Sequence, residues 1–167
     1  YQGAIQFGRG IDEMIFLLKE FPKITALIVG TGSYKRELIK LIENYKVSDR
    51  VIFTGVVPYL DLISYTKQAD IGFSLIQPVS QSYKQALPNK LFEYGLSGIP
   101  TIASNFPEMD KYVNQYKLGL TVNPENYESQ KNVVEQLLNW GNREQLKNIV
   151  QNNFTWEAQE TKFLELI

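Results

Sequence analysis

The chain has 167 residues, of which 44% are hydrophobic, and this length and composition are those of a globular protein with one domain or slightly more. Its 17 basic and 18 acidic residues nearly cancel, so its charge gives no indication of a nucleic-acid partner. Cysteine and histidine are both absent, which excludes disulfides, thiolate nucleophiles and imidazole bases and leaves any acid–base work to carboxylates, lysine, tyrosine or another domain.

The N-terminal part of the chain alternates short apolar runs with helical patterns. Residues 1–6 are predicted to form a strand, and because this strand has no lead-in we expect the chain to be a fragment of a longer polypeptide. Residues 11–18 have apolar side chains at helical spacing, and residues 24–30 form a continuous apolar run typical of a strand covered on both faces. Gly30 and Gly32 begin like a dinucleotide-binding turn, but the third glycine and the later acidic residue are missing, which favours an ordinary strand-to-helix turn.

The middle of the chain continues the same alternation. Residues 50–55 are predicted to form a strand, and residues 70–76 form another apolar run of strand length. Between them Pro58 opens a predicted helix, whose expected buried residues are Leu62, Ile63, Thr66 and Ala69. Residues 77–87 are polar and free of glycine, and they are predicted to form a loop.

The stretch after this loop has the features of an anion-binding helix start. Pro88 suits the first helical position, and the N–H groups of Asn89, Lys90 and Leu91 would then be unbonded and point toward a ligand. A cation in the first turn is normally unfavourable, so Lys90 indicates a bound anion such as phosphate. Glu93 follows about one turn later, where its carboxylate can accept two hydrogen bonds from a vicinal diol such as ribose.

The C-terminal half completes the alternation of strands and helices. Gly98 is predicted to end the helix before a strand at residues 100–103. The remaining predicted elements are a short helix at 105–109, a strand at 117–122, helices at 129–140 and 143–151, and a last helix from residue 154, which leaves Phe163, Leu164 and Ile167 partly uncovered. The whole pattern predicts an α/β fold, a doubly wound Rossmann-like parallel sheet with helices on both faces and its ligand at the carboxyl ends of the strands.

The stretch from Gln85 to Glu93 resembles the donor-site signature of retaining glycosyltransferases of the GT-B fold, family 4. That signature is Glu, seven residues and Glu, followed by small residues, Gly-x-Pro and an apolar strand. Glu93 matches the second Glu, which in the family binds the ribose of the nucleotide. Gln85 stands in place of the first Glu, which contacts the donor sugar, and so keeps an acceptor oxygen but loses the charge. The resemblance also suggests that residues 77–87 form a sugar-contacting lid, with a plain exposed loop as the alternative.

The first residues resemble the opening element of the same family, in which a glycine and basic residues hold the diphosphate. Gly3 and Arg9 match this element, whereas Ala4 stands where a second cation is usual, and Lys90 is a candidate substitute. In the family the backbone after the glycine at position 55 lies beside the base. The resemblance therefore implies substrate binding by Gly3, Arg9, Gly55, Val56, Gln85, Asn89, Lys90, Leu91 and Glu93, with Arg9 and Lys90 stabilising the leaving group.

The resemblance implies the donor-nucleotide-binding domain, residues 1–167, of an enzyme that moves a hexose from a nucleoside diphosphate sugar to a glycan or lipid-linked acceptor in polysaccharide biosynthesis. The N-terminal acceptor domain is expected to be absent, so the isolated chain should be inactive. No Asp-x-Asp motif occurs, and we expect neither a metal nor a cofactor. The implied location is cytoplasmic, with peripheral association at the inner face of the membrane left open.

Two alternatives remain open at this point. One is a sugar-nucleotide 2-epimerase domain of related fold, which normally uses acidic and histidine residues that are missing here. The other is a non-catalytic nucleotide-binding regulatory domain. Epimerised product would favour the first alternative, and nucleotide binding without any role for sugar would favour the second.

Overall fold

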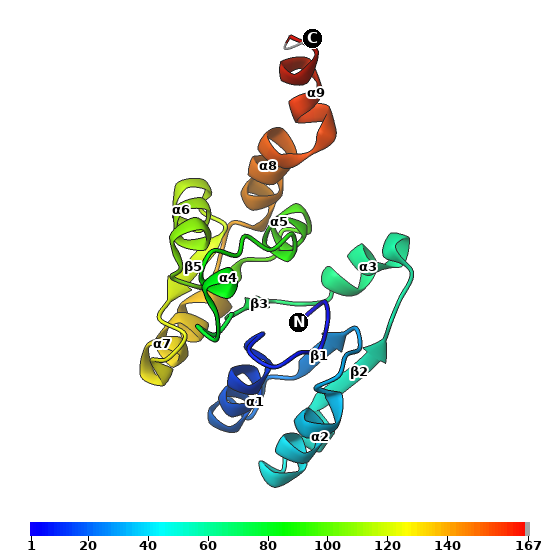
Figure 1. The fold of residues 1–167 in the computed structure, drawn as a ribbon, viewed down its shortest axis with the longest axis vertical. Helices are drawn as coiled ribbons and strands as arrows, with labels where there is room; N and C mark the ends of the chain where they lie inside the picture. Colours follow the sequence, from blue (N-terminus) through cyan, green and yellow to red (C-terminus); the bar gives the residue numbers. More distant parts are fainter. Residues whose placement is uncertain (166–167) are drawn as a thin grey trace.

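The computed structural model describes residues 1–165, in which helices cover both faces of parallel strands (Figure 1). The strands are β1 (Ala26–Val29), β2 (Val51–Gly55), β3 (Gly72–Ser74), β4 (Thr101–Ser104) and β5 (Gly119–Val122). All the pairs between these strands are parallel, with β1 beside β2 and β4 between β3 and β5. The predicted α/β class with parallel strands is confirmed.

The N-terminal segment, residues 1–5, lies beside β1 but is not the regular strand that we predicted. Its one bridge joins Gln2 to Val29, on the edge of β1 opposite β2. The Gly3 and Ile5 N–H groups donate to the Val29 and Thr31 carbonyls, at 2.9 and 3.0 Å. Gly3 has a φ of 123°, which interrupts the extended conformation, and the strands therefore form one group of two and one group of three instead of a single continuous sheet.

The helices alternate with the strands as predicted. They are α1 (Ile11–Glu20), α2 (Lys35–Asn44), α3 (Tyr59–Thr66), α4 (Gln81–Lys84), α5 (Lys90–Leu96), α6 (Pro107–Tyr116), α7 (Tyr127–Leu138), α8 (Arg143–Phe154) and α9 (Trp156–Leu164), with a short 3₁₀ turn, η1 (Ser48–Arg50), before β2.

Two apolar cores fill the space between the strands and the helices. Ile102 and Ala103 are neighbours on β4, yet Ile102 packs with residues of α1, α2 and α7, whereas Ala103 packs with residues of α5, α6 and α8. Because successive side chains of a strand point to opposite faces, the two cores lie on opposite sides of β4. The predicted covering of both faces by helices is confirmed.

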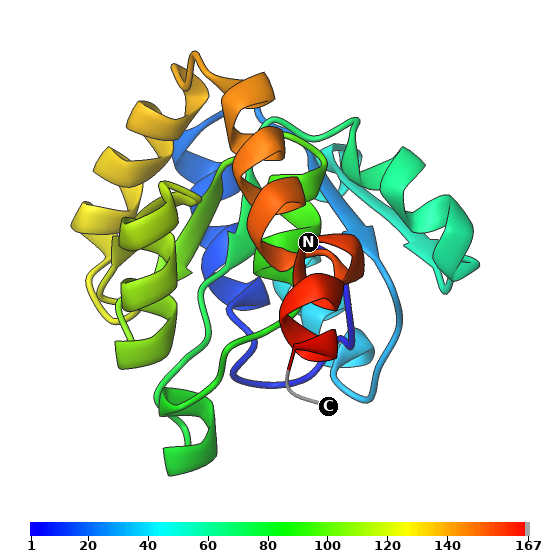
Figure 2. The same ribbon diagram turned by 90° about the horizontal axis from the view of Figure 1, so that it is seen from above.

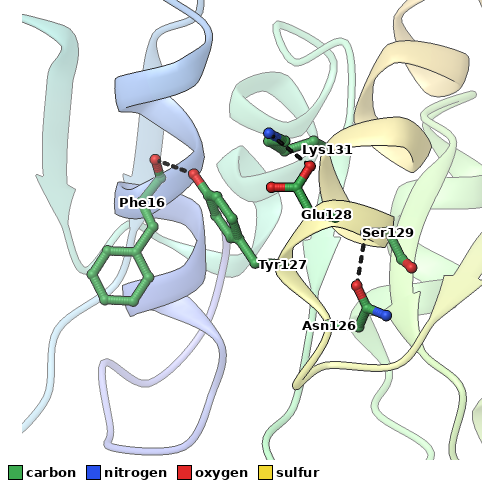
Figure 3. A network of polar contacts seen from close by, with 6 residues as sticks. All are labelled: Phe16, Asn126, Tyr127, Glu128, Ser129 and Lys131. Carbon is green, nitrogen blue, oxygen red and sulfur yellow. Dashed lines mark hydrogen bonds and ion pairs between the residues drawn. The ribbon is translucent and has the colours of Figure 1, made fainter.

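Polar contacts fix α7 against α1 at one end of the first core (Figure 3). The Tyr127 hydroxyl donates to the Phe16 carbonyl at 2.9 Å, and the Asn126 side chain accepts from the Ser129 N–H at 3.0 Å, which caps α7. Lys131 and Glu128 form an ion pair of 2.9 Å on the exposed face of the same helix. These contacts hold the scaffold and lie outside the candidate site.

Two details of the sequence prediction are wrong. Of the four residues predicted to be buried in and after α3, only Thr66 is buried, while Leu62 and Ala69 are half-buried and Ile63 is 38% exposed. The segment 77–87 is not all loop, since the Ser80 hydroxyl accepts from the Tyr83 N–H and starts α4, which stands apart from the layers in Figure 2. At the other end of the chain, Phe163 and Leu164 are exposed as predicted, and Ile167 lies outside the described residues.

Candidate functional site

The site lies where the loop after the N-terminal segment meets the segment after β3. The Gln77 N–H donates to the Gly8 carbonyl at 2.8 Å, which joins the two backbones. Gly10 has a φ of 78°, and a Cβ there would lie 1.9 Å from the Leu75 carbonyl oxygen, so only glycine fits this approach. In folds of this kind, ligands bind in the crevice at the carboxyl ends of the strands where the chain order reverses, and both segments leave such ends.

Arg9 is the first cation of the site. Its guanidinium carbon lies 4.5 Å from the centroid of the Tyr83 ring on α4, close enough for a cation–π contact. Arg9 and Tyr83 line an open hollow of about 610 Å³ together with Gln85, which is exposed at the end of α4. The structure therefore brings together Arg9 and Gln85, two predicted site residues that are far apart in the sequence.

Lys90 is the second cation, and it is buried at 9% exposure. Its ammonium nitrogen lies 4.1 Å from the centroid of the Tyr1 ring, and none of the ion pairs among residues 1–165 includes it. The pKa of Lys90 is lowered from 10.5 to about 7, mainly by burial and then by the charge of Arg9, and the charge of Glu93 opposes both effects. Arg9 and Lys90 are like charges that repel each other, and a bound anion would offset this repulsion.

The start of α5 differs from the prediction in one respect. The Leu91 N–H donates to the Pro88 carbonyl at 3.1 Å, so it is not free to bind a ligand, and the Leu91 side chain is fully buried in the second core. The reason is that Pro88 does not begin the helix: α5 starts at Lys90, with the exposed Asn89 before it, and Pro88 closes a tight turn onto Leu91. The anion-binding role therefore depends on the Lys90 side chain more than on the helix end.

Glu93 lies on α5, facing α3. It is half-buried, and its Oε2 accepts a hydrogen bond from the Gln2 side-chain amide. Glu93 and Gln2 line a cavity of about 220 Å³ with Thr66 and apolar residues of α3. A carboxylate with one lone pair used by Gln2 retains acceptor sites for hydroxyl groups.

The remaining predicted residues are Gly3, Gly55 and Val56. Gly3 is exposed on the N-terminal segment, and its N–H is used in pairing with β1. Gly55 ends β2 with a φ of 73°, and Val56 after it is 76% exposed. Because β1 lies between β2 and the N-terminal segment, Gly55 and Val56 are separated from Gly3 by one strand, at the same carboxyl edge.

A family model described as "Glycosyl transferases group 1" matches residues 1–156. The chain belongs to the group 1 glycosyltransferase family. The alpha-monoglucosyldiacylglycerol synthase of Streptococcus pneumoniae is 31% identical over 103 residues, which are 62% of this chain and 22% of that protein.

Solved structures of glycosyltransferases share the fold of this group 1 member. Sucrose-phosphate synthase from Thermosynechococcus elongatus superposes with a TM-score of 0.83 at 22% identity, covering 98% of this chain and 43% of that one. HepE from Anabaena, solved in complex with UDP, has a TM-score of 0.79 at 18% identity, covering 99% of this chain and 47% of that one. The chain thus has the fold of one half of a GT-B enzyme and spans less than half the length of each of these relatives.

Three residues near the candidate site were missed from the sequence: Gln2, Tyr1 and Tyr83. Each reaches the site through a contact with a residue more than seventy positions away, which leaves no local pattern. Within residues 1–165, no three His, Cys, Asp or Glu side chains gather in a way that could hold a metal ion. A search of the same residues finds no helix with the length and hydropathy of a membrane span.

Proposed function

We propose that this chain is the nucleotide-sugar-binding domain of a retaining glycosyltransferase that moves a hexose from a nucleoside diphosphate sugar. The observation that carries the proposal is that two cations, Arg9 and the buried Lys90, repel each other, and that the half-buried carboxylate of Glu93 acts on the same Lys90 charge. Membership of the group 1 family supports the proposal, as does the UDP bound to HepE.

In this proposal each residue of the pair acts on the diphosphate. When the bond between the anomeric carbon and the diphosphate oxygen breaks, negative charge develops on the leaving oxygen. Arg9 and Lys90 stabilise that charge, because preformed charges in a site with little water act more strongly than they would in solvent. These two cations take the part that a divalent metal plays in other transferases, so we propose that departure of the diphosphate is metal-independent.

The other predicted contacts fit around this centre. Glu93 accepts hydrogen bonds from the ribose hydroxyls, Gln85 faces the donor sugar across the hollow that it shares with Arg9, and the backbone at Gly55 and Val56 borders the base. The acceptor, a glycan or a lipid-linked sugar, is proposed to bind a second domain of a longer polypeptide. Because catalysis in such enzymes requires donor and acceptor to be held in one closed cleft, we propose that the chain alone binds donor without transferring sugar.

The replacement Glu93→Gln tests the ribose contact while preserving the shape of the side chain. A lost hydrogen bond to a charged group is worth roughly 1.5–3 kcal/mol, so UDP or GDP should bind roughly 10- to 150-fold more weakly to the variant in titration calorimetry. The matched control is Glu108→Gln on the exposed surface of α6, which should bind like the parent. Equal affinity of the parent and Glu93→Gln would remove Glu93 from the site.

A further inference from the structure

Gln2 is a buried polar residue that the reaction described above does not use. It is 5% exposed and lies on the N-terminal segment, one position before Gly3. The geometry points to Gln2 as a positioning residue, which holds the Glu93 carboxylate in the orientation that binds ribose, with Thr66 of α3 fixing Gln2 in turn. This inference rests on the proposed function.

The side chain of Gln2 links α3 to α5 through both ends of its amide. Its Nε2 donates to Glu93 Oε2, and its Oε1 accepts from the Thr66 hydroxyl at 2.7 Å. The Leu62 carbonyl lies 2.9 Å from the same hydroxyl and shares its single proton. A carboxylate has no proton to donate, so the amide nitrogen must be the end that faces Glu93. The amide oxygen then faces Thr66, and the chain of donors runs in one direction, from Thr66 through Gln2 to Glu93.

The backbone of Gln2 is fixed as firmly as its side chain. Its N–H donates at 3.1 Å to the hydroxyl of Tyr94, a residue only 2% exposed, and that hydroxyl lies 3.4 Å from the Phe73 carbonyl on β3. The bridge between Gln2 and Val29 attaches the same residue to β1. Gln2 is therefore held by contacts with β1, α3 and α5 together.

This rigidity gives Gln2 a function beyond filling the interior. Glutamate has several rotatable bonds, and ordering such a side chain on binding reduces the affinity for a ligand. Gln2 orders the Glu93 carboxylate before the ligand arrives, and it uses one oxygen while leaving other acceptor sites for a diol. The expected consequence is selective: Gln2 should strengthen binding of a ribose more than binding of a 2′-deoxyribose, which offers Glu93 only its 3′-hydroxyl.

The test compares UDP with 2′-deoxy-UDP, and GDP with 2′-deoxy-GDP, as calorimetric ligands of the 167-residue chain. The variant Gln2→Met keeps the length of the side chain and removes both hydrogen bonds. It should bind the ribonucleotide roughly tenfold more weakly than the parent and lose less affinity for the 2′-deoxynucleotide, which offers Glu93 only its 3′-hydroxyl. If the role of Gln2 were purely structural, the variant would lose the same affinity for both ligands or for neither.

A second pair of variants tests the same inference without changing Gln2. Thr66→Val removes the hydroxyl at nearly constant volume, and Thr66→Ser retains it. Thr66→Val should lower the preference for ribonucleotide in the same direction as Gln2→Met, while Thr66→Ser should keep the preference of the parent. If Gln2→Met does not fold, as judged by circular dichroism, this pair decides the question.

The outcomes separate the inference from the proposed function. If the parent prefers ribonucleotide and both Gln2→Met and Thr66→Val retain that preference, Gln2 does not position Glu93, although the proposed function stands. If the parent binds none of the four nucleotides, the proposed function fails and the positioning role fails with it. A loss of preference in both variants, with Thr66→Ser like the parent, establishes the role of Gln2.

Discussion

Lys90 is predicted to lower the stability of the protein and to raise its affinity for diphosphate, and the substitution Lys90→Met separates the two effects. Methionine has a similar length, is apolar and has no charge to desolvate. In the wild-type protein the pKa of Lys90 falls from 10.5 to about 7, first because the ammonium group is buried and second because Arg9 repels it. Removing the charge should therefore stabilise the fold and weaken binding.

The direction of the pH dependence follows from which state holds the proton. Between pH 7 and 10.5 the unfolded chain keeps the proton on Lys90 while the folded chain has lost it, so the stability contributed by Lys90 rises with pH across this window. Below pH 7 both states are protonated and the full cost is present. The difference between 10.5 and about 7 sets an upper limit of roughly 5 kcal/mol on that cost.

Urea unfolding of the two proteins at a series of pH values measures this cost. Burial also raises the pKa of Glu13 to about 7, which removes stability as the pH rises from 4.5 to that value, but the Glu13 effect is common to both proteins and cancels in the difference. We expect Lys90→Met to be the more stable protein at pH 6, with an advantage that shrinks as the pH rises from 7 toward 10.

Diphosphate binding should also depend on the protonation of Lys90, but binding favours the charged form, which folding disfavours. A diphosphate beside Lys90 restores the charged form, so at about pH 8.5 binding should take up about one proton, measured by calorimetry in buffers of different ionisation heat. Lys90→Met should bind more weakly and take up none, while Lys84→Met, on the exposed face of α4, should behave as the parent. The reasoning is refuted if the two proteins show the same change of stability with pH and the parent takes up no proton on binding.

Two further predictions concern the loop and the reaction. Gly10→Ala should destabilise the protein by about 2–4 kcal/mol in urea unfolding, because it combines a positive φ with a clash against the Leu75 carbonyl. The control Gly141→Ala, with open space around it, should leave the stability unchanged. An unchanged stability of Gly10→Ala would contradict the described loop. In a transfer assay with labelled donor sugar, the 167-residue chain should show no transfer, and activity should appear only in a longer polypeptide with an N-terminal Rossmann-like domain; strong transfer by the chain alone would overturn that proposal.

The order of elements could be predicted from the sequence because it depends on local patterns. The apolar spacing of residues 11–18 predicted α1, and the continuous apolar run at 24–30 predicted β1. The end of α5 at Gly98 was predicted for the same reason: with a φ of 74°, Gly98 lets the Ile99 N–H reach back to the Tyr94 carbonyl at 2.9 Å. Each of these signals lies within a few residues of its effect.

The errors and omissions arise where distant parts of the chain decide the outcome. The helical pattern of α3 predicted a buried face, but the side chains of a helix are buried only where another element covers them, and Leu62 and Ile63 are covered only in part. Lys90 contacts the ring of Tyr1 and is repelled by Arg9, and both residues are more than eighty positions away. The hydrogen bond from Gln2 to Glu93 spans 91 positions, and no spacing rule describes it.

These long-range contacts share one physical consequence. Below pH 7 the folded protein keeps Lys90 charged although it is buried and repelled by Arg9, and Glu93 opposes the repulsion without forming an ion pair with Lys90 in the described part of the chain. A diphosphate would neutralise both cations at once, and the interaction would be strong because water is largely excluded from Lys90. The cost in folding free energy of burying this charge is then offset when the anion binds, which raises the affinity for the anion. The site should for this reason be the place where substitutions that stabilise the fold weaken binding, which is the outcome expected for Lys90→Met.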